Sequence, residues 1–102
     1  VGGSGEEGKI LEYQGSAWKE IALKETPHII GIRVQGETGY AVGIRGTVLE
    51  RDNNEWRKVN TGITLSEAFH SVWIDSEGGV WAVGGKVLAP PLVDGVMIYR
   101  AP

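Results

Sequence analysis

Cysteine is absent from this 102-residue chain, so the sequence offers neither a disulfide framework nor a thiolate metal site. No apolar run approaches the roughly 18 residues that a membrane-spanning helix needs. Positive charge is not in excess either, because ten Lys and Arg residues stand against thirteen Asp and Glu residues. Affinity for nucleic acid depends on neutralising phosphates, so we expect neither nucleic acid nor a membrane as a partner. We expect a soluble protein whose compartment the sequence leaves open.

Glycine, in contrast, is abundant. It makes up 16 of the 102 residues, against a usual share of about 7%. Because glycine tolerates the backbone angles of tight turns, this excess favours short strands joined by turns. Hydrophobic residues make up 41% of the chain, which is enough for a core, and the length fits a single domain.

Related segments recur along the chain at intervals of about 40 residues. The sets are residues 39–43 and 80–84; residues 8–13, 46–51 and 95–100; and the stretches around Trp18 and Trp56. The first three residues also match residues 83–85, as a further copy that begins within a strand. A repeat of this length indicates one supersecondary unit per copy.

Within each copy the pattern is that of strands. Apolar and other residues alternate in 30–34 and again in 71–74, and Gly-rich or polar turns follow both stretches. One complete unit is predicted to contain four strands, at residues 29–34, 39–43, 47–51 and 56–60. The turns between the third and fourth strands carry Gly and Asn residues, which tolerate a positive φ.

Four short antiparallel strands in a repeat of about 40 residues are typical of a β-propeller blade. The sequence therefore predicts an all-β chain that holds about two and a half blades. We expect residues 1–27 to supply the third and fourth strands of one blade, 28–62 a complete blade, and 63–102 the first three strands of another.

Trp81-Ala82-Val83-Gly84, the Gly-led segment 8–13, the hairpin 14–16 and the strand-leading Trp18 and Trp56 together resemble bacterial β-propellers of the neuraminidase-repeat-like kind. The hairpin departs from the sialidase Asp-box, because Gln14 replaces the aspartate in one copy and Asn53 follows Asp52 in another. Residues 56–59, 71–73 and 80–83 also resemble the tectonin repeat, a family of propeller lectins. Both resemblances imply the same fold, and they differ in the function they imply.

A closed propeller has about four to eight blades, so a chain of this length would leave blade edges uncovered. Two explanations are open: several copies assemble into a ring, or the chain is an excerpt of a longer propeller. We prefer the excerpt, because the strands at the two ends do not simply complement each other.

Tryptophans are the first candidates for a site. We expect Trp18 and Trp56 to be buried between adjacent blades. Trp73 lies out of phase with the apolar residues of its strand, at the position where the other copy has Arg33. It is predicted either to serve ordinary packing or to line a central channel or a sugar-stacking site.

The loops between the second and third strands of each blade differ most in length and chemistry. Because insertions in repeats gather on one face, which is often the binding face, Arg45 in the second of these loops is a candidate. The third loop is apolar and rich in proline, and its candidates are Val87, Leu88 and Leu92. This loop either folds back on its own blade or docks a partner.

Other chemistries are not supported by the sequence. His28 and His70 have no second ligand at metal-binding spacing, and they fit a loop or a channel lining better. Residues 3–8 match G-x-G-x-x-G, but a strand pattern follows where a nucleotide site needs a helix. We therefore expect no metal, no cofactor and no catalytic constellation.

The sequence predicts a non-catalytic propeller scaffold that binds a protein or peptide on the face of the second-to-third-strand loops. The alternative is a lectin-like module that binds carbohydrate through residues such as Trp73. A fragment of a glycoside hydrolase is the weakest reading, because its catalytic groups would have to come from other blades.

Overall fold

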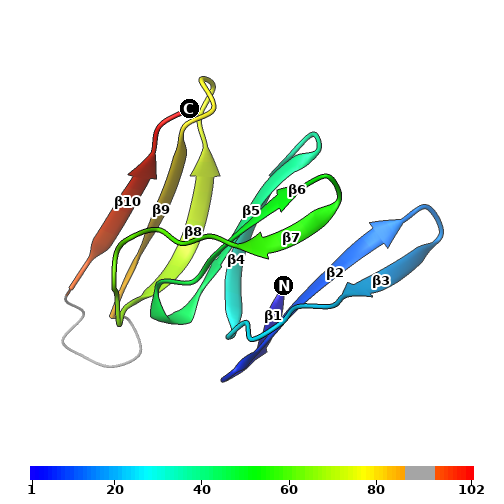
Figure 1. Cartoon of the computed structure of the whole chain (residues 1–102), viewed down its shortest axis with the longest axis horizontal. Coiled ribbons are helices and arrows are strands. Elements are labelled where there is room, and N and C mark those ends of the chain that lie inside the picture. The colour runs from blue at the N-terminus through cyan, green and yellow to red at the C-terminus, as the bar shows by residue number, and fades with distance from the viewer. Residues whose placement is uncertain (87–93) are drawn as a thin grey trace.

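The computed structural model describes residues 1–86 and 94–102 of the chain. These residues form ten strands in three antiparallel sheets (Figure 1). The first sheet contains β1 (Gly2–Ser4), β2 (Glu7–Gln14) and β3 (Ala17–Ile21). The second contains β4 (Ile29–Gln35), β5 (Thr38–Gly43), β6 (Val48–Asp52) and β7 (Glu55–Lys58). The third contains β8 (Ala68–Ile74), β9 (Val80–Gly85) and β10 (Val96–Arg100).

The all-β class is confirmed, and the four strands predicted for the complete unit coincide with β4 to β7 to within about two residues. The only helical element in the described part of the chain is the 3-10 turn η1 (Ile44–Gly46), which the sequence did not predict. No helix within residues 1–86 and 94–102 is long and apolar enough to cross a membrane.

Hairpin turns form where the sequence places residues that tolerate a positive φ. Gly15 has a φ of 71° between β2 and β3, and Asn53 and Asn54 have φ values of 50° and 65° between β6 and β7. In the third sheet the turn after β8 is held by Asp75, whose carboxylate accepts hydrogen bonds from the backbone N–H groups of Glu77 and Gly79. The Trp81 indole also donates to this carboxylate, and this bond, foremost, lowers the pKa of Asp75.

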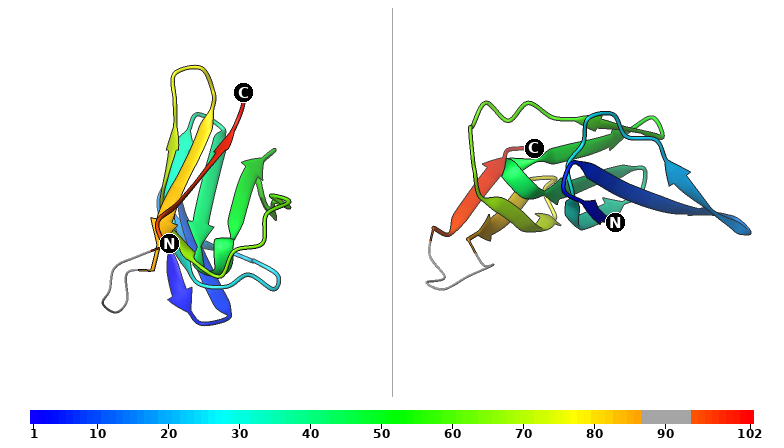
Figure 2. Two further views of the ribbon diagram at one scale, coloured as in Figure 1. Left: turned by 90° about the vertical axis from the view of Figure 1, so that its left-hand side faces the viewer. Right: turned by 90° about the horizontal axis from the view of Figure 1, so that it is seen from below.

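The three sheets stand side by side in chain order, and strands β4 and β8 lie next to each other (Figure 1). Seen from below, the third sheet and the β2–β3 hairpin lie at opposite ends of the molecule, with the second sheet between them (Figure 2). The molecule is accordingly elongated, with extents of 44 × 33 × 21 Å.

The core is divided into two layers, each lying between neighbouring sheets. Between the first and second sheets, the buried residues are Ile10, Ile29, Ala41 and Leu49. Between the second and third sheets, they are Tyr40, Val42, Val48, Phe69, Val72, Val80 and Ala82. Each sheet therefore uses its neighbour, rather than a helix, to cover its apolar side chains.

The same kind of ion pair joins each sheet to the next. Glu12 on β2 accepts a hydrogen bond from Arg51 on β6 at 3.0 Å, and Glu50 on β6 accepts one from Arg100 on β10 at 3.0 Å. These residues occupy matching positions in the repeats, because residues 8–13, 46–51 and 95–100 align without a gap. The contact between sheets therefore repeats together with the sequence.

Of the two tryptophans predicted to be buried, Trp56 is partly buried and Trp18 is exposed, so the prediction for Trp18 is wrong. Trp56 packs on the core between the first and second sheets, and its indole N–H donates to Glu12 at 3.0 Å. Trp18, at the matching position of the first sheet, is 68% exposed. Trp18 points away from the second sheet, and no other described residues cover that face.

Candidate functional site

Strands β4 and β8 are edge strands of their sheets that lie side by side, and we call them the inner strands. Each contains a β-bulge at the same position. The pairing register of β4 with β5 shifts between Ile29 and Gly31, and that of β8 with β9 shifts between Phe69 and Ser71. Ile30 and His70 are therefore matching extra residues, one in each inner strand. Bulges bend a strand and redirect a side chain, and they are common next to binding and active sites.

The bulges lie where the backbone of each inner strand approaches a glycine of the next strand. A Cβ atom on Gly43 would lie 2.0 Å from the His28 carbonyl oxygen, and one on Gly84 would lie 1.9 Å from that of Ala68. No side chain fits at either distance, which explains why glycine ends the repeated Ala-Val-Gly segment in both sheets. Gly2 holds the matching position in the first sheet and has open space around it.

A cavity of about 620 Å³ lies beside the bulges, at the end of the molecule where β5 and β9 end. We call it the loop-face cavity. Its lining residues are His28, Ile30, Ile44, Arg45, Ser66, Glu67, Ala68, His70, Gly85, Lys86 and Asp94. The second and third sheets and the segments that lead into their inner strands all contribute to this lining, so the cavity depends on how these two sheets pack.

Backbone hydrogen bonds hold the loops around this cavity. The Ile44 N–H donates to the His28 carbonyl at 3.1 Å, and the Gly46 N–H donates to the Glu67 carbonyl at 2.9 Å. The His28 N–H in turn donates to the Gly5 carbonyl of the first sheet's loop at 2.9 Å. Loops from all three repeats meet here, and the cavity wall is fixed by main-chain contacts.

The cavity lining carries both charge signs and two imidazoles. Arg45 and Lys86 are basic, and Glu67 and Asp94 are acidic. The Nη2 atom of Arg45 also donates to both carboxylate oxygens of Glu6, at 2.7 and 2.8 Å, but both side chains are exposed, so this pair adds little stability. The Nε2 atom of His70 is buried and has no hydrogen-bond partner among the described residues. A ligand with hydrogen-bonding groups of both kinds would suit such a surface.

The structure separates the residues that the sequence singled out. Arg33 and Trp73 hold matching positions on β4 and β8, and the Arg33 guanidinium lies 4.5 Å from the centre of the Trp73 ring. This pair is next to the turns that follow β4 and β8, at the opposite end of the strands from Arg45. The remaining candidates, Val87, Leu88 and Leu92, lie outside the described residues.

Both histidines line the cavity, which agrees with the expectation of a loop or channel lining. Lys86 and Asp94 are the first and last residues of the third candidate loop, whereas the sequence did not single out Glu67. The sequence signal for Glu67 is weak. Glu67 lies just before β8, and the matching residue before β4 is Pro27, so the two repeats do not share a charged residue at this position.

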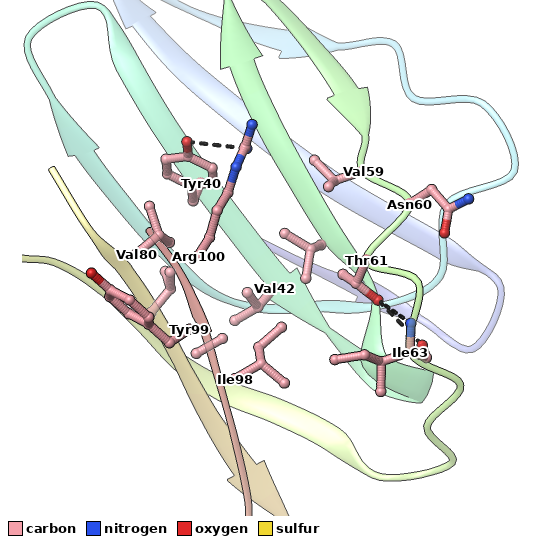
Figure 3. A pocket seen from close by; sticks show the side chains of 13 residues that line it. Tyr40, Val42, Val59, Asn60, Thr61, Ile63, Val80, Ile98, Tyr99 and Arg100 are labelled. Atoms are coloured by element: carbon pink, nitrogen blue, oxygen red, sulfur yellow. Dashed lines mark hydrogen bonds between the residues drawn. The ribbon is translucent and has the colours of Figure 1, made fainter. Parts of the chain in front are cut away.

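A second cavity, of about 300 Å³, opens between the second and third sheets (Figure 3). We call it the inter-sheet cavity. Its apolar wall includes Val42, Val80 and Ile98, and its polar rim includes Tyr40 and Arg100. The Tyr40 hydroxyl donates to Glu50 at 2.8 Å, and burial, together with this carboxylate, raises the pKa of Tyr40. The residues of this cavity belong to the packing between the two sheets.

Within residues 1–86 and 94–102, no group of three or more His, Cys, Asp or Glu side chains is arranged to hold a metal ion. Comparison of the chain with known protein families, curated proteins and solved structures found no match.

Proposed function

We propose that the three sheets are successive blades of a non-catalytic β-propeller scaffold, and that its loop face binds a protein or peptide partner. Two observations support the blade arrangement. Each sheet is a meander in chain order, with β4 and β8 side by side at the inner edge. The Glu12–Arg51 contact between the first two sheets recurs as Glu50–Arg100 between the next two.

The loop-face cavity is the observation that carries the binding role. It lies where loops of successive sheets meet, and loops held on a rigid scaffold commonly carry binding residues. The wall presents Lys86 and Arg45 as donors and Glu67 and Asp94 as acceptors, around the apolar Ile30 and Ile44. A peptide segment offers complementary groups of all three kinds, whereas a simple anion or cation would meet charges of its own sign.

Affinity capture with the chain as bait tests this proposal. Lys86→Glu and Arg45→Glu reverse charge on the loop face, and each is expected to reduce capture of a specific partner by at least about tenfold, which is about 1.4 kcal/mol of binding free energy. Arg57→Glu is the matched control, because Arg57 is exposed, lies next to the β6–β7 turn and forms only a surface pair with Asp52. Capture that the loop-face variants leave unchanged would overturn the proposal.

Carbohydrate binding is the second candidate, and the observation that favours it is the exposure of Trp73, 52% of which is open to solvent. Aromatic faces of this kind can stack on sugar rings. Glycan-array binding that Trp73→Ala abolishes and Lys86→Glu leaves intact would support this candidate in place of the first. The two functions use opposite ends of the strands, so the same set of variants separates them.

A further inference from the structure

Each end of the row of sheets exposes an apolar face. On the first sheet, the face turned away from the second sheet carries Leu11, Tyr13 and Trp18, which are 52%, 60% and 68% exposed. We call it the first-sheet outer face. On the third sheet, the corresponding third-sheet outer face carries Val83, Met97 and Tyr99, which are 40%, 64% and 48% exposed.

Both faces carry a pair of aromatic residues on neighbouring strands. Tyr13 and Trp18 are cross-strand partners with ring centres 5.4 Å apart, and Trp81 and Tyr99 are cross-strand partners with ring centres 4.4 Å apart. Aromatic and apolar clusters of this kind on a surface mark interaction sites.

Residues that match these positions are buried inside the molecule. Leu11 matches Leu49, which is 1% exposed in the layer between the first and second sheets. Val83 matches Val42, which is fully buried in the layer between the second and third sheets. Each outer face is therefore built like one half of a contact that the chain makes twice internally.

The charged positions of the internal contact are changed on both outer faces. The repeat places Tyr99 where Glu12 and Glu50 stand, and Tyr13 where Arg51 and Arg100 stand. A lone Glu or Arg at such a contact would lose water without gaining an ion partner. Because both members of the pair are replaced by the neutral Tyr, the two outer faces suit each other, and neither suits a charged half of the internal contact.

We infer that the third-sheet outer face of one copy binds the first-sheet outer face of a second copy, an inference that rests on the blade arrangement proposed above. In this contact Tyr99 of one copy meets Tyr13 and Trp18 of the other, and Met97 and Val83 pack against Leu11. The Trp18 indole takes the Tyr99 hydroxyl as its acceptor, as Trp56 takes the Glu12 carboxylate within the chain. The two surfaces differ, so the association is heterologous.

Light scattering coupled to size exclusion, over a wide range of concentration, tests this inference with the 102-residue chain. The wild-type chain is expected to show a mass that rises with concentration above that of one copy. Leu11→Asp and Met97→Asp each block one outer face and are expected to be monomeric when alone. Val34→Asp is the matched control, because Val34 is 54% exposed and belongs to neither face, and it is expected to behave as the wild type.

Mixing the two blocked variants gives the decisive result. Leu11→Asp retains the third-sheet outer face and Met97→Asp retains the first-sheet outer face, so the mixture is expected to form a one-to-one complex that does not grow further. A monomeric wild type, or a mixture that stays monomeric, would overturn the inference. Association that only one of the two substitutions prevents would also overturn it, because it would mean that one face pairs with itself.

A second pair of variants keeps the test independent of any folding defect. One variant carries Tyr13→Arg on its first-sheet outer face, and the other carries Tyr99→Glu on its third-sheet outer face. When the two are mixed, this contact regains the Glu–Arg pair found inside the chain. The mixture is expected to associate more tightly than either variant alone. Circular dichroism verifies that each variant retains its strands. Partner capture through Lys86 and Arg45 is measured separately, so failure of the proposed partner binding leaves these results unaffected, and the reverse also holds.

Discussion

At the scale of single residues, Glu12 is the side chain that ties the first sheet to the second. One of its oxygens accepts hydrogen bonds from both the Trp56 indole and the Arg51 guanidinium, each at 3.0 Å. The Arg51 and Glu12 side chains are only 14% and 20% exposed. The bond from Trp56, followed by those from Arg51 and Gln14, lowers the pKa of Glu12 below its usual value of 4.5, although partial burial opposes this shift.

Replacing Glu12 by Ala leaves the Arg51 and Trp56 donors without their acceptor. We expect Glu12→Ala to lower the free energy of unfolding by about 1–3 kcal/mol, measured by urea denaturation with tryptophan fluorescence. Glu20→Ala is the matched control, because Glu20 makes only an exposed pair with Lys9 at 3.4 Å, and we expect a change within about 0.5 kcal/mol. Equal losses for the two variants would contradict the role assigned to Glu12.

The lowered pKa of Glu12 also predicts how stability depends on pH. Folding favours the ionised carboxylate, so its contribution is fully present above the unfolded-state pKa and is lost as the pH falls through the lower folded-state pKa. The difference in unfolding free energy between the wild type and Glu12→Gln is therefore expected to be greatest near neutral pH and to shrink below about pH 4. A difference that stays constant down to acidic pH would contradict this assignment.

At the scale of elements, the inner strands β4 and β8 determine the shape of the loop face. Each has a bulge at the same place, and each begins against a glycine of its partner strand, Gly43 or Gly84. Beyond the bulge, the side chains of the two strands differ in how far they are exposed to solvent. Val72 on β8 is 6% exposed, whereas Ile32 and Val34 on β4 are 39% and 54% exposed, because the first sheet has no strand in line with β4 to pack against them.

A methyl group at the bulge tests this reading of the inner strands. Gly43→Ala would place a carbon against the His28 carbonyl, and we expect a loss of about 1–3 kcal/mol of unfolding free energy, because the backbone must shift. Gly2→Ala makes the same change at the matching position of the first sheet, where space is open, and is expected to be neutral within about 0.5 kcal/mol. Thermal and urea denaturation measure both, and equal effects would contradict the close approach.

The strands could be predicted because apolar alternation and glycine-rich turns are local signals. The bulges could not be predicted. Ile29 and Ile30 are both apolar, so the sequence does not show that Ile30 is the extra residue at which the alternation of the strand shifts. The prediction that Trp18 is buried was wrong for a related reason. The same local sequence pattern places Trp56 against a neighbouring sheet and leaves Trp18 exposed to solvent. The loop-face cavity brings together His28, Glu67 and Lys86 from distant parts of the chain, and no spacing in the sequence signals that meeting.

At the scale of the whole molecule, the same Glu–Arg contact between neighbouring sheets occurs twice. The pair Glu12–Arg51 lies between the first and second sheets, and the pair Glu50–Arg100 lies between the second and third. In the blade arrangement proposed above, one rotation would relate each sheet to the next, and the two equivalent contacts support that proposal. Repeat proteins built in this way expose half of the contact at each end, which is where the apolar outer faces are found.

The most direct test of this account is a set of distances between spin labels, which the absence of native cysteine makes straightforward. Gln14 and Asp52, the last residues of β2 and β6, match Ala101, the first residue after β10, and all three are exposed, so cysteines introduced there in pairs report on the spacing of the sheets. The distances from 14 to 52 and from 52 to 101 are expected to be equal within the width of their distributions, and the distance from 14 to 101 is expected to be clearly longer. Two unequal neighbouring distances, or a shortest distance between 14 and 101, would contradict the arrangement of the sheets as successive blades.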